Sequence, residues 1–149
     1  MKRANVLRLV AILAVVVLAS MTAGCLKASI SLEVVLDPEE YTVGENLKGE
    51  ATVVATGLAK GGVYHTLTVD FLDTGSPVNV LDTVKKEDLN VVIKPWDNNP
   101  ISITLDDLEL TVPEDAGGAA DARFTLTGDG LGLVPITVTV KCIVAEPLP

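Results

Sequence analysis

The chain has few of the side chains that usually perform enzyme chemistry. Its 149 residues include one histidine, two cysteines and only five aromatic residues. A single histidine excludes a multi-histidine metal site, and it leaves a Ser-His-Asp arrangement with no alternative base. No nucleophile-elbow, phosphate-loop or zinc-ligand spacing is present. The scarcity of aromatic rings also disfavours a carbohydrate-stacking platform.

Basic residues are also scarce, with 11 Lys and Arg against 20 Asp and Glu and a net charge of −9. Three of the 11 basic residues lie in the first 24 positions. Residues 25–149 therefore carry 8 basic and 20 acidic side chains, a formal charge of −12. Such a surface repels phosphate, which excludes nucleic-acid binding by charge. Valine and threonine remain abundant, which argues against disorder.

The amino-terminal segment has the three parts of a secretory signal. Met1–Arg8 carries three positive charges, Leu9–Leu18 is an unbroken apolar run, and Ala19–Cys25 consists largely of small residues. The uncharged stretch from residue 9 to residue 24 is 16 residues long. A membrane-spanning helix needs about 20. We therefore predict a signal helix rather than a permanent span.

The end of this segment, Thr22-Ala23-Gly24-Cys25, resembles the lipobox of prokaryotic lipoproteins. The resemblance implies that the chain is cut between Gly24 and Cys25, that the Cys25 thiol is acylated, and that the new amino terminus can be acylated too. Thr22 departs from the leucine that the family usually has. The resemblance predicts an extracytoplasmic protein held by lipid on the cell membrane or outer membrane. An ordinary secreted protein and an uncleaved single-span anchor are the alternatives.

These features divide the chain into four parts. We predict a signal peptide over 1–24, a short lipid-proximal tether over 25–29, a β-sandwich over 30–145 and a tail over 146–149. The tether reaches less than about 20 Å when fully extended, so the folded body is expected to lie close to the lipid headgroups.

Alternation of apolar and polar residues dominates the rest of the chain and predicts half-buried strands. The clearest runs are 30–36, 67–71, 101–105, 122–126 and 134–144, and weaker ones are 47–55, 78–81 and 89–93. With turn residues between them, these runs predict an all-β, antiparallel sandwich of about seven to nine strands. Residues 83–88 (TVKKED) are predicted to form a solvated connection or a short helical turn. The parity change at Asp106-Asp107 suggests a bulge or a change of sheet.

Two stretches resemble the turns of macroglobulin-type and other immunoglobulin-like domains. These are residues 36–47 (LDPEEYTVGENL) and residues 112–118 (VPEDAGG). The resemblance implies an immunoglobulin-like sandwich, and it implies no particular function.

The acidic loops are the only candidates for ion binding. Calcium prefers several carboxylate and carbonyl oxygens, which strand-connecting loops can supply. The candidate ligands are Asp97, Asp106 and Asp107, with Glu114, Asp115 and Asp121 as a further acidic group. The alternative is that these acids are simply solvated.

Three other residues have a functional and a structural interpretation. Trp96 is either a contact residue displayed on a loop or a cap on the core. His65 is expected to be a structural or surface histidine at a strand start. Cys142 is expected to be a buried, inert thiol, because acylation of Cys25 leaves it without a partner. Without lipidation, a Cys25–Cys142 disulfide becomes the alternative.

The leading interpretation is a lipid-anchored, non-enzymatic sandwich that acts as a structural, adhesive or accessory binding module with a protein partner in the cell envelope. The alternative is a lipoprotein that binds a small ligand or a divalent ion such as calcium and serves a transporter or envelope complex. An enzyme ranks third, because carboxylate catalysis needs a paired, partly desolvated cleft.

Overall fold

The computed structural model describes residues 29–56, 61–94, 97–130 and 133–146. These residues form ten β-strands and two short 3-10 helices, as the alternation predicted for an all-β protein. The elements, in chain order, are β1 (Ser29–Leu36), β2 (Glu40–Tyr41), β3 (Gly49–Thr56), β4 (Gly62–Leu72), β5 (Val80–Lys86), β6 (Val91–Ile93), β7 (Ile101–Thr104), η1 (Leu105–Leu108), η2 (Glu114–Ala116), β8 (Asp121–Asp129), β9 (Ile136–Lys141) and β10 (Ile143–Val144). The predicted signal helix lies outside the described residues.

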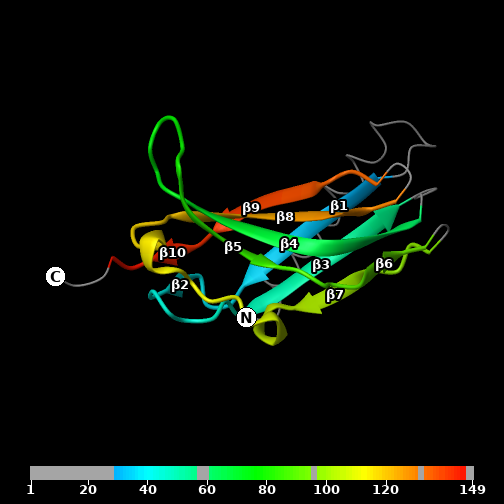
Figure 1. The fold of residues 1–149 in the computed structure, drawn as a ribbon, viewed down its shortest axis with the longest axis horizontal. Helices are drawn as coiled ribbons and strands as arrows, with labels where there is room; N and C mark the ends of the chain where they lie inside the picture. Colours follow the sequence, from blue (N-terminus) through cyan, green and yellow to red (C-terminus); the bar gives the residue numbers. More distant parts are fainter. Residues whose placement is uncertain (1–28, 57–60, 95–96, 131–132, 147–149) are drawn as a thin grey trace, which may run out of the picture.

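Eight of the ten strands form two antiparallel sheets that face each other (Figure 1). One sheet has three strands in the order β1-β3-β7. The other has five, in the order β5-β4-β8-β9, with β6 pairing along the same edge of β4 as β5. Strands β1 and β9 lie close to each other and bring the two sheets together along one side.

The core lies between the two sheets and is made by the inward half of each alternation. Its buried side chains include Leu32, Val34 and Leu36 of β1, Ala51 and Val53 of β3, Leu67, Val69 and Phe71 of β4, and Ala122, Phe124 and Leu126 of β8. Among the described residues no polar or charged side chain is buried. Burial of apolar area at roughly 25 cal/mol per Å² is therefore the main stabilising term.

The outward face of the five-stranded sheet is polar and has an ion pair at its centre. Arg123 of β8 donates from Nη2 to Oδ2 of Asp70 on β4, at 3.0 Å. The Thr83 hydroxyl of β5 donates to the other carboxylate oxygen, at 2.7 Å. Three neighbouring strands are thus joined across one row of the sheet, as expected for cross-strand pairs.

Several local predictions were wrong. Residues 83–86 of the predicted connection belong to β5, an edge strand that β4 pairs along its length. An edge strand needs little apolar alternation, and Lys85 and Lys86 are typical of such edges. At Asp106-Asp107 the parity changes because the chain makes the 3-10 helix η1, not a bulge. The other alternative, a change of sheet, agrees with the topology, because β7 lies in the three-stranded sheet and the next strand, β8, lies in the five-stranded one.

The end of the sandwich that contains Leu36 and Leu72 is closed by a short parallel pair, so the fold is not wholly antiparallel. Strand β10 pairs with β2 in parallel, with Val144 opposite Tyr41. The predicted single strand over 134–144 is divided at Cys142 into β9 and β10. Val134, predicted to lie in its apolar row, precedes β9 and is exposed.

Candidate functional site: the outer face of the three-stranded sheet

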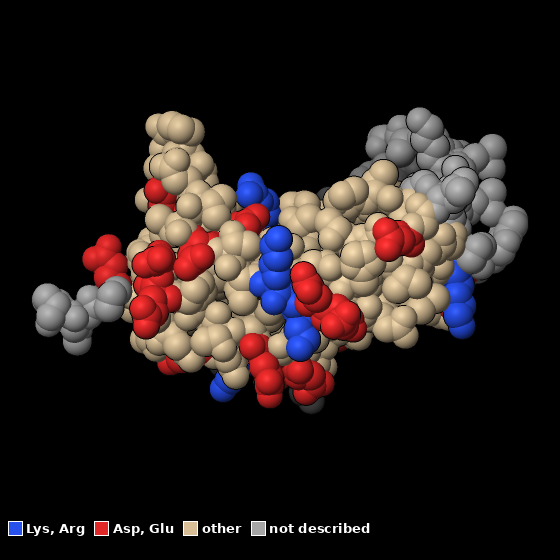
Figure 2. All heavy atoms as spheres, viewed as in Figure 1, with Lys and Arg blue, Asp and Glu red and all other residues tan. Residues whose placement is uncertain are grey.

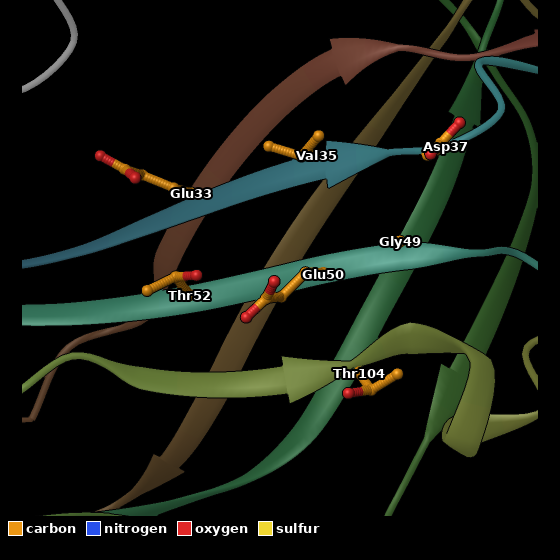
Figure 3. A pocket seen from close by; sticks show the side chains of 7 residues that line it. All are labelled: Glu33, Val35, Asp37, Gly49, Glu50, Thr52 and Thr104. Carbon is orange, nitrogen blue, oxygen red and sulfur yellow. The ribbon is translucent and has the colours of Figure 1, made fainter. Parts of the chain in front are cut away.

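The outward face of β1, β3 and β7 has a shallow hollow of about 390 Å³ (Figure 3). It is lined by Glu33, Val35, Asp37, Gly49, Glu50, Thr52 and Thr104. The pairing of the strands places these side chains in rows. Glu33 lies opposite Thr52, and Val35 lies opposite Glu50, which in turn lies opposite Thr104.

The hollow depends on a close approach of two backbones at Gly49. This residue has a φ of 133°, and a Cβ there would overlap the carbonyl oxygen of Val35 and lie 3.0 Å from the Leu36 Cα. The Gly49 N–H donates to Oδ1 of Asp106, at 3.0 Å. Only glycine allows β3 to begin here in this conformation.

The hollow carries three carboxylates and two hydroxyls, and no Lys or Arg lines it. Among the described residues, Glu33, Asp37 and Glu50 form no ion pair. The labelled side chains in Figure 3 are spread along three strands rather than converging on one point. The face can therefore accept hydrogen bonds and attract positive charge, but it pairs no nucleophile with a base.

The structure does not bring the predicted calcium ligands together. Asp97 follows β6 and precedes β7, whereas Asp106 and Asp107 lie in η1 at the other end of β7. A four-residue strand separates the two groups by roughly 13 Å. Each of two candidates already has a local role: Oδ1 of Asp97 accepts the Asn99 N–H, and Oδ1 of Asp106 accepts the Gly49 N–H.

In the described ranges, no three His, Cys, Asp or Glu side chains are grouped so that they could hold a metal ion. Glu114 and Asp115 lie in η2, and Asp121 begins β8. Calcium binding stays a prediction.

His65 lies inside β4, not at a strand start, at an irregularity in the pairing of β4 with β8 between Tyr64 and Thr66. Its Nε2 lies 3.2 Å from Oδ2 of Asp129, and its Nδ1 lies 2.8 Å from the Thr66 hydroxyl. Its side chain is 44% exposed. These contacts agree with the prediction of a structural or surface histidine.

Three of the predicted functional residues, Trp96, Gly24 and Cys25, lie outside the described residues.

Cys142 is a free, fully buried cysteine, as its place in the apolar row predicted. Burial, and then the nearby negative charge of Asp121, raise the pKa of its thiol from 9.0 to about 12. The thiolate is the reactive form, so the native thiol is expected to be inert at neutral pH. Because the folded protein raises the pKa of this thiol, the unfolded chain loses the proton at a lower pH than the folded chain does. The free energy of unfolding is therefore unaffected by this group below about pH 9 and decreases as the pH rises toward 12.

We predict that Cys142 in the Cys25→Ser full-length chain, where it is the single thiol, does not react with a thiol-specific reagent at pH 7.5 until the protein is unfolded. Guanidinium chloride should release one equivalent of thiol. Complete reaction of the native chain at that pH, as fast as in denaturant, would contradict this assignment.

The residues of the hollow were not found from the sequence. The alternation places Glu33 and Thr52 on outward positions, which was the available signal. Which outward residues become neighbours depends on strand order and register, and neither can be read from one sequence.

The fold and this face are the context for comparison with known proteins. No protein-family model and no curated protein matches the chain. Among solved structures, the chain is similar to the sporulation control protein Spo0M from Bacillus subtilis, with a TM-score of 0.51 and 13% identity over 80% of this chain and 50% of that one. A β-glucosidase from Listeria innocua in complex with gluconolactone matches with a TM-score of 0.33 and 13% identity, over 80% of this chain and 17% of that one.

The chain thus spans about half the length of Spo0M, and the likeness supports an all-β fold alone. As for membrane crossing, none of the helices in the described ranges is both long and apolar enough to do so.

Proposed function

We propose that this chain is an extracytoplasmic lipoprotein whose β-sandwich is a non-enzymatic binding module held against a membrane through Cys25. The observation that carries the proposal is the sequence Thr22-Ala23-Gly24-Cys25, which begins three residues after the apolar run ends at Leu18 and places Cys25 four residues before β1 begins at Ser29. Two acyl chains hold a protein firmly on a bilayer, whereas one gives only marginal attachment.

The short tether sets the position of the folded body. Four residues reach about 14 Å when extended, so the Ser29 end of the sandwich would lie next to the lipid headgroups. The −12 charge of residues 25–149 opposes any further attraction to an anionic leaflet. The lipid, not the protein surface, would therefore provide the membrane affinity.

Binding rather than catalysis is supported by the chemistry of the described surface. The hollow on the three-stranded sheet offers hydrogen-bond acceptors in open solvent. Catalytic carboxylates need partial desolvation and a partner that moves their pKa toward neutrality. A face that is open and spread over three strands suits recognition.

The intact mass of the protein purified from membranes tests the proposal. We expect a polypeptide that begins at Cys25 and exceeds the mass of residues 25–149 by attached lipid. Hydrolysis of the ester-linked acyl chains should remove most of the excess and leave the group that joins them to the Cys25 sulfur, together with any amide-linked chain. A chain that begins at Met1, or one without lipid, would contradict the proposal.

A further inference from the structure

A projecting hairpin between β4 and β5 forms an uncharged tip on an otherwise acidic protein. Residues 73–79 extend beyond the sheets as a narrow loop (Figure 1). No charged residue occurs between Asp73 and Asp82. Val78 is 59% exposed and Val80 is 46% exposed. Pro77, which immediately precedes Val78, is exposed as well. Val78 and Val80 are thus two exposed apolar side chains on one uncharged projection, free to contact a partner.

The hairpin is held in one shape by Asp73. The Oδ1 atom of this residue accepts the N–H groups of Gly75, at 3.1 Å, and of Asn79, at 2.8 Å. The Asp73 N–H donates to the Asn79 carbonyl oxygen, at 3.0 Å, which closes the base of the loop. The N–H donors of Asn79 and Gly75 lower the pKa of the Asp73 carboxyl, so these bonds persist at neutral pH. A preordered loop loses little conformational entropy when it binds.

Three acidic side chains lie near the base of the hairpin, on or beside β5. Glu114 and Asp115 are exposed in η2, which packs against β5, and Asp82 lies on β5 itself. None of the three forms an ion pair with another described residue. Figure 2 shows the projection free of charge at its tip, with acidic residues gathered on the body of the same end. An apolar centre with a charged rim is the usual anatomy of a protein interface.

The hairpin lies at the end of the sandwich opposite the start of β1. At the end of β4 from which the hairpin projects, the Leu72 carbonyl oxygen accepts the Ala120 N–H. Val144 at the same end of the sandwich pairs with Tyr41, five residues after β1 ends at Leu36. Ser29 lies at the other end of the eight-residue strand β1 (Figure 1). An anchor at Cys25 fixes the Ser29 end to lipid, so the hairpin would lie at the end of the sandwich that is far from that membrane.

We propose that the hairpin of residues 73–80 docks into an apolar pocket with a basic rim on a separate protein that faces the membrane-distal end of the sandwich. This inference rests on the proposed function, because the anchor decides which end of the sandwich lies far from the membrane. Pro77, Val78 and Val80 fill the pocket, and the carboxylates near β5 select the basic rim and speed association. The same carboxylates oppose a second copy of this chain, which carries equal negative charge.

The test places a photoreactive benzoylphenylalanine at position 78 of the full-length chain in its own cells. The matched control has the same group at Val92, an exposed valine on β6 of the same sheet, near the opposite end of β4. We expect position 78, and not position 92, to cross-link to one protein that mass spectrometry identifies. That protein, purified, should bind full-length chain in detergent with an affinity reduced about tenfold by Val78→Asp.

Two further measurements sharpen the test. Val92→Asp should leave the affinity within about twofold, and binding should weaken as NaCl rises from about 0.05 to 0.5 M, because the rim contacts are screened. Cross-links only to lipid or only to a second copy, equal cross-linking at positions 78 and 92, or an unchanged affinity of Val78→Asp would each overturn the docking proposal. A chain recovered in the soluble fraction contradicts the lipid anchor instead, whichever position cross-links.

Discussion

Replacing Gly49 by alanine is expected to destabilise the sandwich by about 3 kcal/mol or more and to lower its melting temperature by roughly 10 °C. Two effects add at this position. The added Cβ overlaps the backbone carbonyl oxygen of Val35, which pairing with β3 holds in place. A φ of 133° is also strained for any residue with a side chain. Relief would need β1 and β3 to separate where they frame the hollow.

Gly44→Ala is the matched control. Gly44 also has a positive φ, of 92°, but no atom outside its immediate neighbours lies within 4 Å of the Cβ position. Gly44→Ala should therefore lower the free energy of unfolding by only about 1 kcal/mol, the cost of a positive φ for a residue with a side chain. Thermal and guanidinium unfolding of wild type and the two variants measure the difference. Equal stability of the two variants would show that β1 and β3 do not approach each other as described.

The strands were largely predictable because each has one face in the core. In β1, Leu32, Val34 and Leu36 are buried, and Glu33 and Val35 between them point outward, which is the two-residue period that the sequence displays. The same holds for β8, where Ala122, Phe124 and Leu126 are buried. Burial of one face of a strand therefore produces an alternation of apolar and polar residues that can be read from the sequence.

Elements that depend on hydrogen bonds to a neighbouring strand show no such alternation in the sequence. The lysines of β5 lie on an edge strand that depends on β4, and the two-residue strand β2 exists because β10 pairs with it. The helix η1 changes the parity at Asp106 through local backbone geometry. Although Tyr41 of β2 and Leu105 of η1 are buried, each element is too short for an apolar pattern, so a single sequence predicts them poorly.

The hollow and the hairpin were also predictable only in part. That Glu33 points outward follows from the alternation, but its position opposite Thr52 depends on register. Gly75 and Pro77 are residue types common in turns, so the sequence indicates a turn at this hairpin. That it projects, and that its valines are exposed, depends on where the two sheets end, and that end is defined only by tertiary structure.

The Cys25→Ser variant is expected to lose lipid attachment completely. In the lipoprotein family that the amino terminus resembles, the acyl chains are attached at the cysteine that follows the small residues, here Cys25. Serine keeps the size of the side chain and removes the thiol on which acylation depends. Each buried methylene contributes about 0.8 kcal/mol to membrane affinity, so loss of both chains removes essentially all of it.

Cys142→Ala is the matched control, because it removes the other cysteine of the chain. Cys142 is buried and unreactive, so this variant should keep its lipid and its place on the membrane. A modest loss of stability from the smaller core side chain does not affect that readout.

Metabolic labelling with a palmitate analogue, followed by membrane fractionation of wild type, Cys25→Ser and Cys142→Ala, tests the lipid anchor most directly. We predict label and membrane association in wild type and Cys142→Ala, and neither in Cys25→Ser. Equal labelling of Cys25→Ser and wild type, or no label in wild type, would contradict the anchor at Cys25.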